Sequence, residues 1–231
     1  MKIDTVFFDA GETLLTPIGT WSGMSADVLR ERGHDVSVEA LQEAWRHGGQ
    51  HFVNAAEDRV MFSLSDHASH TFWTSLYHDM LDFLEIDDED APEILYATFS
   101  DPANYKLFDD AVPTLLALRE RGLKLGVISN FESWLNTMLE VLDVTIHFDV
   151  IAVSGDLGWE KPDPKIFQWA MEHAATEPGR ALHVGDSPHF DAQPAHDLGM
   201  TGVLLDRHAR WTDLQADYPR ISSLSELTNL L

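Results

Sequence analysis

The chain has 231 residues, of which 44% are hydrophobic, so it is long enough for one large domain or for a core domain with a smaller insertion. It contains no cysteine, which excludes disulfides, thiolate zinc sites and cysteine nucleophiles. Its 39 acidic and 15 basic residues give a formal net charge of -24, and a surface of that sign repels nucleic acid and anionic membranes. Such a composition is typical of proteins that work in high salt and also of ordinary acidic cytoplasmic proteins.

The N-terminal segment reads MKIDTVFFDAG and predicts a strand over Ile3–Phe8. It has neither the apolar h-region nor the small-residue cleavage site of an export signal. No apolar run in the chain approaches the roughly 20 residues of a membrane-spanning helix. We therefore expect a soluble, cytoplasmic protein whose partners include neither a membrane nor nucleic acid.

The stretch from Pro17 to Tyr105 differs from the rest of the chain, because amphipathic periodicity predicts helices there with no convincing strand between them. These helices are Met24–Arg32, Val38–His47, Ala68–Leu84 and Ala91–Phe99. Pro17 and the turn Asp101-Pro102 stand near the two ends of the stretch. We predict an all-helical domain at residues 17-105, inserted into a core domain made of residues 1-16 and 106-231.

The remainder of the chain alternates short apolar runs with amphipathic stretches. The runs are apolar on both faces, as parallel strands covered by helices must be, and they follow the first strand at Leu123–Ser129, Val150–Ser154, Ala181–Val184 and Gly202–Leu205. The stretches between them predict helices over Ala111–Arg121, Phe131–Leu142, Pro164–Ala174 and Asp191–Leu198. This alternation predicts an α/β fold with a doubly wound, Rossmann-like parallel sheet.

Polar residues follow the predicted strands, where doubly wound enzymes place their sites. Asp9 ends the first strand, and it suits a nucleophile, a metal ligand or a capping residue. Ser129 and Asn130 end the second strand, where a hydroxyl and a new helix N-terminus suit an oxyanion, although a plain N-cap serine explains them equally well.

Two further signals lie nearer the C-terminus. Lys161 precedes two prolines in GWEKPDPKIF, so a stiff loop can hold its charge against a phosphate, although most lysines are solvated. Asp186 and Asp191 follow the fourth predicted strand in HVGDSPHFDAQPAHDLGM. Paired carboxylates suit a hard cation such as Mg²⁺, although a capping aspartate turn also explains them.

Taken together and in this order, the four signals resemble the four motifs of the haloacid dehalogenase-like superfamily. The resemblance extends to LLALRERG before ISN, to KPDPKIF and to the ending GDS…D…A…GM, and it covers almost the whole chain. The helical insertion looks like the cap domain of the superfamily's subfamily I. The run VISNFESWLNTML is similar to a branch of rhythmically expressed gene-like proteins.

The resemblance implies a Mg²⁺-dependent phosphatase that acts on a small phosphorylated substrate through an aspartyl phosphate. Asp9 is then the nucleophile, Ser129 and Asn130 bind the phosphate with Lys161, and Asp191 orients Lys161 or a metal-bound water. The implied metal ligands are Asp9, the backbone carbonyl of Gly11, and Asp186. The substrate's identity and the oligomeric state are not implied.

One position departs from the family pattern. Family phosphatases carry a second aspartate two residues after the nucleophile as general acid and base, and this chain has Gly11 in Asp9-Ala10-Gly11-Glu12-Thr13. Because general acid–base catalysis contributes about 10²–10⁴-fold, we expect a slow enzyme or one with a good leaving group. Glu12 is one candidate substitute, although neighbouring residues at a strand end face opposite ways. A histidine of the helical insertion is a second candidate for the missing general acid and base.

Three other functions fit the sequence less well than phosphatase activity. Haloacid dehalogenases resemble the chain but lack the metal-binding aspartate that Asp186 matches. Phosphonatases need a cap lysine, and there is none between Pro17 and Tyr105. A non-catalytic protein that binds a phosphorylated ligand or partner finds support only in Gly11. The histidine pairs of the insertion, His47 with His51 and His67 with His70, do not match a zinc motif.

Overall fold

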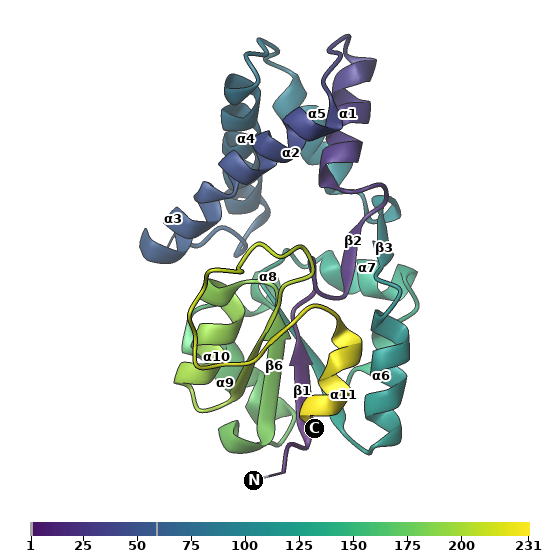
Figure 1. Cartoon of the computed structure of the whole chain (residues 1–231), viewed down its shortest axis with the longest axis vertical. Coiled ribbons are helices and arrows are strands. Elements are labelled where there is room, and N and C mark those ends of the chain that lie inside the picture. The colour runs from purple at the N-terminus through teal and green to yellow at the C-terminus, as the bar shows by residue number, and fades with distance from the viewer. Residues whose placement is uncertain (1, 59) are drawn as a thin grey trace. The chain divides into compact units, whose positions relative to one another are not determined.

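The computed structural model describes residues 2–58 and 60–231, and the chain divides into two compact units (Figure 1). The first, Met1–Leu15 with Leu107–Leu231, is called the core unit below, and the second, Thr16–Lys106, the helical unit. The chain passes between them through two short paired strands, β2 (Leu15–Pro17) and β3 (Tyr105–Leu107). No described helix is both long enough and apolar enough to cross a membrane.

The core unit is built on a six-stranded sheet whose described pairings are all parallel, in the order β5-β4-β1-β6-β7-β8. The strands are β1 (Thr5–Phe8), β4 (Lys124–Ser129), β5 (Val150–Val153), β6 (Ala181–Gly185), β7 (Thr201–Leu205) and β8 (Arg220–Ile221). β1 lies between β4 and β6, with Phe8 paired to Val127 on one side and Val184 on the other. The predicted α/β fold with a Rossmann-like parallel sheet is confirmed.

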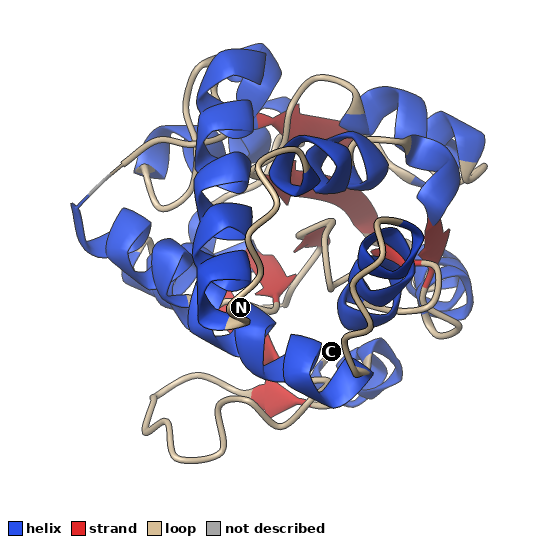
Figure 2. Ribbon diagram, turned by 90° about the horizontal axis from the view of Figure 1, so that it is seen from above, coloured by secondary structure: helices blue, strands red, loops and turns tan. Residues whose placement is uncertain are grey.

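Helices cover the sheet of the core unit (Figure 2). They are α6 (Ala111–Glu120), α7 (Leu135–Val141), α8 (Ser154–Leu157), α9 (Pro164–His173), α10 (Gln193–Asp197) and α11 (Leu227–Leu230), with a π-helical turn at Pro188–Ala192 before α10. Phe7 and Ile128 pack with Ile166 and Phe167 of α9. Full burial of each such side chain contributes about 1.5–3 kcal/mol to the free energy of folding. This packing fixes the strand ends that carry the polar residues.

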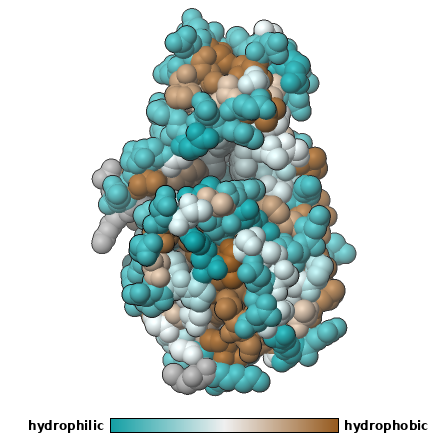
Figure 3. Space-filling view, viewed as in Figure 1, coloured by the Kyte–Doolittle hydropathy of each residue, from teal (hydrophilic) through white to brown (hydrophobic). Residues whose placement is uncertain are grey.

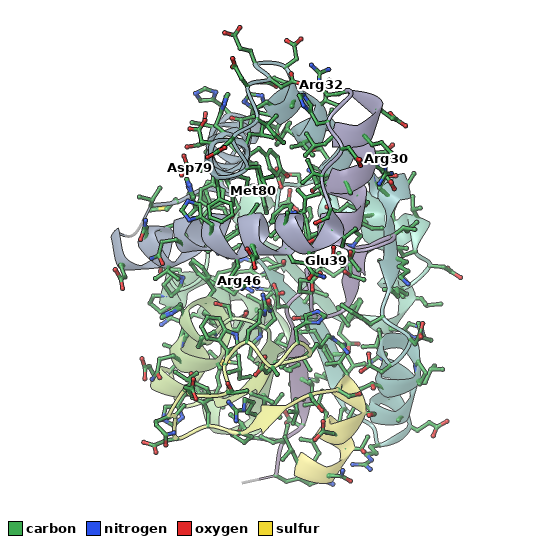
Figure 4. The ribbon with its side chains drawn as sticks, turned by 45° about the horizontal axis from the view of Figure 1, so that its top comes forward. Arg30, Arg32, Glu39, Arg46, Asp79 and Met80 are labelled. Carbon is green, nitrogen blue, oxygen red and sulfur yellow. The ribbon has the colours of Figure 1, made fainter. Side chains whose placement is uncertain are left out.

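The helical unit contains α1 (Trp21–Glu31), α2 (Val38–Gly48), α3 (Gln50–Asp58), α4 (Asp66–Phe83) and α5 (Ala91–Phe99). Thr20, Ser37 and Ser65 begin three of these helices, each accepting a hydrogen bond from a backbone N–H of the first turn. Met80 lies in the buried core of the unit (Figure 4). Elsewhere in the unit, two nitrogens of the Arg32 guanidinium donate to the Asp88 carboxylate at 2.6 and 2.5 Å.

Several predicted boundaries are wrong. α7 begins at Leu135 and not at Phe131, because residues 130–134 form an irregular turn in which Phe131 N–H binds the Ser154 hydroxyl at 2.9 Å. α3 was missed because Gly48-Gly49 looks like a helix break, yet a new helix begins at Gln50. β2, β3 and β8 were missed because strands of two or three residues leave no periodic pattern. Polar residues cover much of the face drawn in Figure 3, as the acidic composition requires.

Candidate active site

The site lies at the carboxyl ends of three adjacent strands. Asp9 follows β1, Ser129 ends β4, and Asp186 follows β6. Because β1 pairs in parallel with both β4 and β6, these residues meet at one edge of the sheet. The N–H of Asp9 extends the ladder by donating to Val184 O at 2.9 Å. The Ser129 hydroxyl donates to Asp9 Oδ1 at 3.1 Å, inside a buried environment.

Lys161 is buried between two carboxylates. Its Nζ lies 2.7 Å from Asp9 Oδ1 and 2.6 Å from Asp191 Oδ1, and only 2% of its surface is exposed. Burial disfavours the charge of Lys161, but Asp191 and Asp9 outweigh this and raise its pKa above the ordinary value. The alternative of a solvated surface lysine is therefore wrong. A buried lysine with two carboxylate partners keeps a fixed positive charge at the strand ends.

The Asn130 side chain fixes the backbone of Lys161. Asn130 Oδ1 accepts from the Lys161 N–H at 2.6 Å, and Asn130 Nδ2 donates to the Lys161 carbonyl at 2.8 Å. The Lys161-Pro162 peptide is cis. No helix begins at Ser129 or Asn130, since α7 begins at Leu135, so the expected helix N-terminus at this position is wrong. The amide of Asn130 holds the lysine loop against β4.

Asp191 organises the opposite side of Lys161. Its Oδ1 accepts from Lys161 and from His183 Nε2 at 2.9 Å, and its Oδ2 accepts from the Ser187 N–H at 3.1 Å. Although burial disfavours the ionised form, Lys161 and His183 lower the pKa of Asp191 to about 2. Gly185 makes room for this carboxylate, because a Cβ there would lie 2.2 Å from Asp191 Cγ.

His183 is a site residue that sequence reasoning missed. It lies in β6, is fully buried, and has no hydrogen-bond partner for Nδ1 among the described residues. Burial lowers the pKa of His183, so the neutral ring is favoured, and the Nε2–H tautomer donates to Asp191. The available signal was a single polar side chain within the apolar run ALHVG.

Asp186 completes a cluster of carboxylates. Oxygens of Asp9, Asp186 and Asp191 lie within 4.8 Å of one another. Burial raises the pKa of Asp186 to about 7, with Arg210 opposing this and Asp9 adding to it. Crowded oxygen ligands fit a hard divalent cation, which relieves their mutual repulsion. Asp191 already accepts three hydrogen bonds, which leaves its oxygens less capacity for a cation.

Gly11 and Glu12 occupy a tight turn after Asp9. The Glu12 N–H donates to Leu15 O at 2.8 Å, and Glu12 has a φ of 53°, in the left-handed region. Strand alternation therefore does not describe the direction of this side chain. Glu12 Oε2 lies 3.3 Å from His208 Nε2, on the loop that follows β7. A Cβ at Gly11 would meet no atom within 4 Å, so the position has room for a side chain.

A family model described as haloacid dehalogenase-like hydrolase matches residues 3–199. The chain belongs to the haloacid dehalogenase-like hydrolase family. It is 32% identical over 218 residues to the haloacid dehalogenase-like hydrolase domain-containing protein 3 of Bos taurus, a match that covers 89% of this chain and 82% of that protein. It is also 38% identical to the rhythmically expressed gene 2 protein of Drosophila melanogaster over 91 residues, a match that covers 38% of this chain and 35% of that protein.

Phosphatases are also among the relatives of this haloacid dehalogenase-like hydrolase. A phosphoserine phosphatase of Thermus thermophilus is 33% identical over 141 residues, covering 60% of this chain and 59% of that protein. Of solved structures, a HAD phosphatase from Thermococcus onnurineus has a TM-score of 0.61 and 26% identity, covering 100% of this chain and 97% of that one. A 2-haloacid dehalogenase from Pseudomonas syringae has a TM-score of 0.60 and 25% identity, and the match covers 99% of this chain and 97% of that one.

Proposed function

We propose that this haloacid dehalogenase-like hydrolase is a Mg²⁺-dependent phosphatase that acts on a small phosphorylated metabolite, with Asp9 as the nucleophile. The observation that carries the proposal is the contact of Lys161 Nζ with Asp9 Oδ1 at 2.7 Å in a buried site. A fixed cation beside the attacking carboxylate is what phosphoryl transfer requires, since catalysis there is mainly positioning and charge neutralisation. The phosphatases among the relatives support the same reaction class.

In the first step, an Asp9 carboxylate oxygen attacks phosphorus and the bond from phosphorus to the leaving oxygen breaks, so that the leaving group departs either as a stable anion or with a proton taken from water. In the second step, water attacks the same phosphorus and the bond between phosphorus and the Asp9 oxygen breaks. The water gives up a proton to the departing phosphate or to solvent, and the Asp9 carboxylate is restored. Lys161 and Ser129 hold the phosphoryl oxygens beside Asp9, and Asp191 holds Lys161. A Mg²⁺ ion would be held by Asp9, Asp186 and the Gly11 carbonyl, and it would supply further positive charge for the phosphate.

Gly11 sets the rate of both steps in this proposal. No carboxylate at position 11 protonates the leaving group or removes a proton from water. The chain therefore favours leaving groups that need no proton, and its second step is slow. The Glu12 carboxylate, which is paired with His208, is the described acid or base nearest in sequence to this position. The second candidate function, binding of a phosphorylated ligand without turnover, has its support in Gly11 as well.

We also propose that the helical unit is the cap of subfamily I members and selects the substrate. The nucleophile, the cations and the carboxylate cluster named above all lie in the core unit, so the helical unit, Thr16–Lys106, is free for a role in binding the substrate. A domain inserted through two adjacent connections can open and close around a site. Substitution of helical-unit residues is then expected to change the KM for different phosphorylated substrates more than the kcat.

The test is hydrolysis of p-nitrophenyl phosphate in MgCl₂ by wild type, Asp9→Asn and Asp143→Asn. Asp143 is an exposed aspartate with a φ of 55°, a conformation that asparagine tolerates, so it is a matched control. The proposal predicts that Asp9→Asn abolishes hydrolysis, that Asp143→Asn does not, and that EDTA reduces the wild-type rate. Equal rates for Asp9→Asn and wild type would exclude Asp9 as the nucleophile. A wild type that binds phosphate but turns over no phosphate ester would favour the non-catalytic alternative.

A further inference from the structure

The loop that follows β7 is anchored beside Asp186 (yellow-green in Figure 1). The carboxylate of Asp206 accepts from the backbone N–H groups of Arg210 and Trp211, at 2.7 and 3.1 Å. The indole N–H of Trp211 donates to the Asp186 carbonyl at 3.1 Å. These contacts hold the first part of the loop, residues 206–211, so the backbone of Arg210 has a defined place next to the carboxylate cluster.

The side chain of Arg210 binds the same residue. Its Nη2 lies 2.6 Å from Asp186 Oδ2, the carboxylate to which the proposed function gives a role as metal ligand. The Arg210 side chain is 44% exposed and that of Asp186 is 21% exposed. The guanidinium therefore has solvent on one side and a partly buried carboxylate on the other. It can leave the carboxylate without being buried elsewhere.

The second cation of the site behaves differently. Lys161 is 2% exposed and is held by Asp9 and Asp191 together, so it has no route to solvent. Arg210 contacts one carboxylate of the cluster, at its solvent-facing edge. A divalent cation on Asp186 would repel a guanidinium on the same carboxylate, since like charges a few ångströms apart repel each other strongly even at an effective dielectric constant of about 20.

We propose that Arg210 is a built-in counter-ion that occupies Asp186 when the divalent cation is absent and competes with that cation for it. This proposal rests on the proposed function only in taking Asp9 and Asp186 as the cation's ligands. Arg210 neutralises a carboxylate that would otherwise be crowded against two others. Binding of the cation requires Arg210 to withdraw toward solvent. Arg210 thereby lowers the affinity of the site for the cation and sets the concentration at which the site fills.

The test is calorimetric titration of the whole protein with MgCl₂ at about pH 8.5, where protons compete little for carboxylates. Arg210→Gln removes the charge and Arg210→Lys keeps it. Arg119→Gln is the matched control, because Arg119 binds Asp149 in the same unit at 2.7 Å and is 34% exposed. Loss of a charged hydrogen bond that is partly exposed predicts about three- to thirty-fold tighter Mg²⁺ binding for Arg210→Gln. The dissociation constants of Arg210→Lys and Arg119→Gln are expected to stay within about twofold of wild type.

The outcomes separate this inference from the proposed function. Tighter binding only in Arg210→Gln supports the counter-ion, and so does binding that is measurable in Arg210→Gln but not in wild type. Unchanged or weaker binding in Arg210→Gln, with wild-type binding that Asp186→Asn removes, rejects the counter-ion and leaves the metal site intact. Binding in none of these proteins rejects both. If Arg210→Gln does not fold, Arg210→Met is titrated with the same expectation.

Discussion

Lys161 and Asp9 form an ion pair that is almost sealed from solvent, with Nζ 2.7 Å from Oδ1. The two residues are 152 positions apart, and the pair exists because the Asn130 amide holds the lysine loop against the end of β4. A buried carboxylate with a fixed cation is poised to attack an anionic group, because the cation offsets the repulsion between the two negative charges.

Replacing Lys161 with methionine removes the cation and keeps the volume. We expect kcat/KM for p-nitrophenyl phosphate to fall by at least about 100-fold, as loss of a charge-stabilising donor does in other enzymes. Lys165→Met is the control, because Lys165 lies four residues along the same loop and helix with its side chain 59% exposed. Circular dichroism checks that both variants fold. Similar losses in both would mean that the effect is not specific to the pair.

Gly11→Asp is expected to restore the missing acid and base. The site has room for the side chain, since a Cβ at Gly11 meets no atom within 4 Å. We expect kcat/KM to rise for alkyl phosphates by up to about 10²-fold and to change little for p-nitrophenyl phosphate, because nitrophenolate leaves without a proton. Steady-state kinetics on the two substrates measure the difference. An equal rise for both would show that Gly11 does not limit protonation of the leaving group.

His183 is expected to act as a positioning residue for Asp191. His183→Leu removes the Nε2–H donor, whereas His183→Gln can offer an N–H at similar reach. We expect kcat to fall about 10-fold in the leucine variant, with little change in KM, and to recover in the glutamine variant. Losses of this size are typical when a residue that orients a site's ligand by a hydrogen bond is replaced. Equal losses in both variants, together with equal losses of thermal stability, would indicate a packing role only.

The stability of the metal-free protein should depend on pH through Asp186. Burial raises its pKa to about 7, above the value of about 4 for an unfolded aspartate. The folded state therefore holds this proton more tightly, and the contribution of Asp186 to the free energy of unfolding falls as pH rises from about 4 to about 7. Urea unfolding in EDTA should show wild type losing stability relative to Asp186→Asn over that range. A difference between the two that does not vary with pH contradicts the raised pKa.

Much of the core unit follows from sequence pattern. The apolar runs predicted β1, β4, β5, β6 and β7 because strands covered on both faces must be apolar throughout. The sequence also indicated which strand ends carry Asp9, Ser129 and Asp186, although the roles of these residues stay predictions. It left open whether Lys161 is buried, because burial of a charge depends on partners that are distant in the chain.

Other features of the site were beyond sequence reasoning for physical reasons. The left-handed backbone of Glu12 breaks the alternation on which its predicted direction depended. Arg210 meets Asp186 only because Asp206 folds the intervening loop back, and no local pattern encodes that contact. The sequence does mark His183, as a polar residue inside an apolar strand. Its contact with Asp191 could not be predicted, because the π-helical turn at Pro188–Ala192 sets the position of Asp191.

The most direct test of Asp9 as a phosphorylated nucleophile is pre-steady-state hydrolysis of p-nitrophenyl phosphate in MgCl₂, with acid-quenched protein analysed by peptide mass spectrometry. Because the first step needs no general acid with this substrate and the second step lacks a base at Gly11, the phosphorylated enzyme should accumulate. We expect a burst of about one nitrophenolate per protein molecule, one phosphoryl group on Asp9, and neither in Asp9→Asn. Linear release from the first turnover with no phosphoryl group on Asp9, or a phosphoryl group on another residue, would contradict the account.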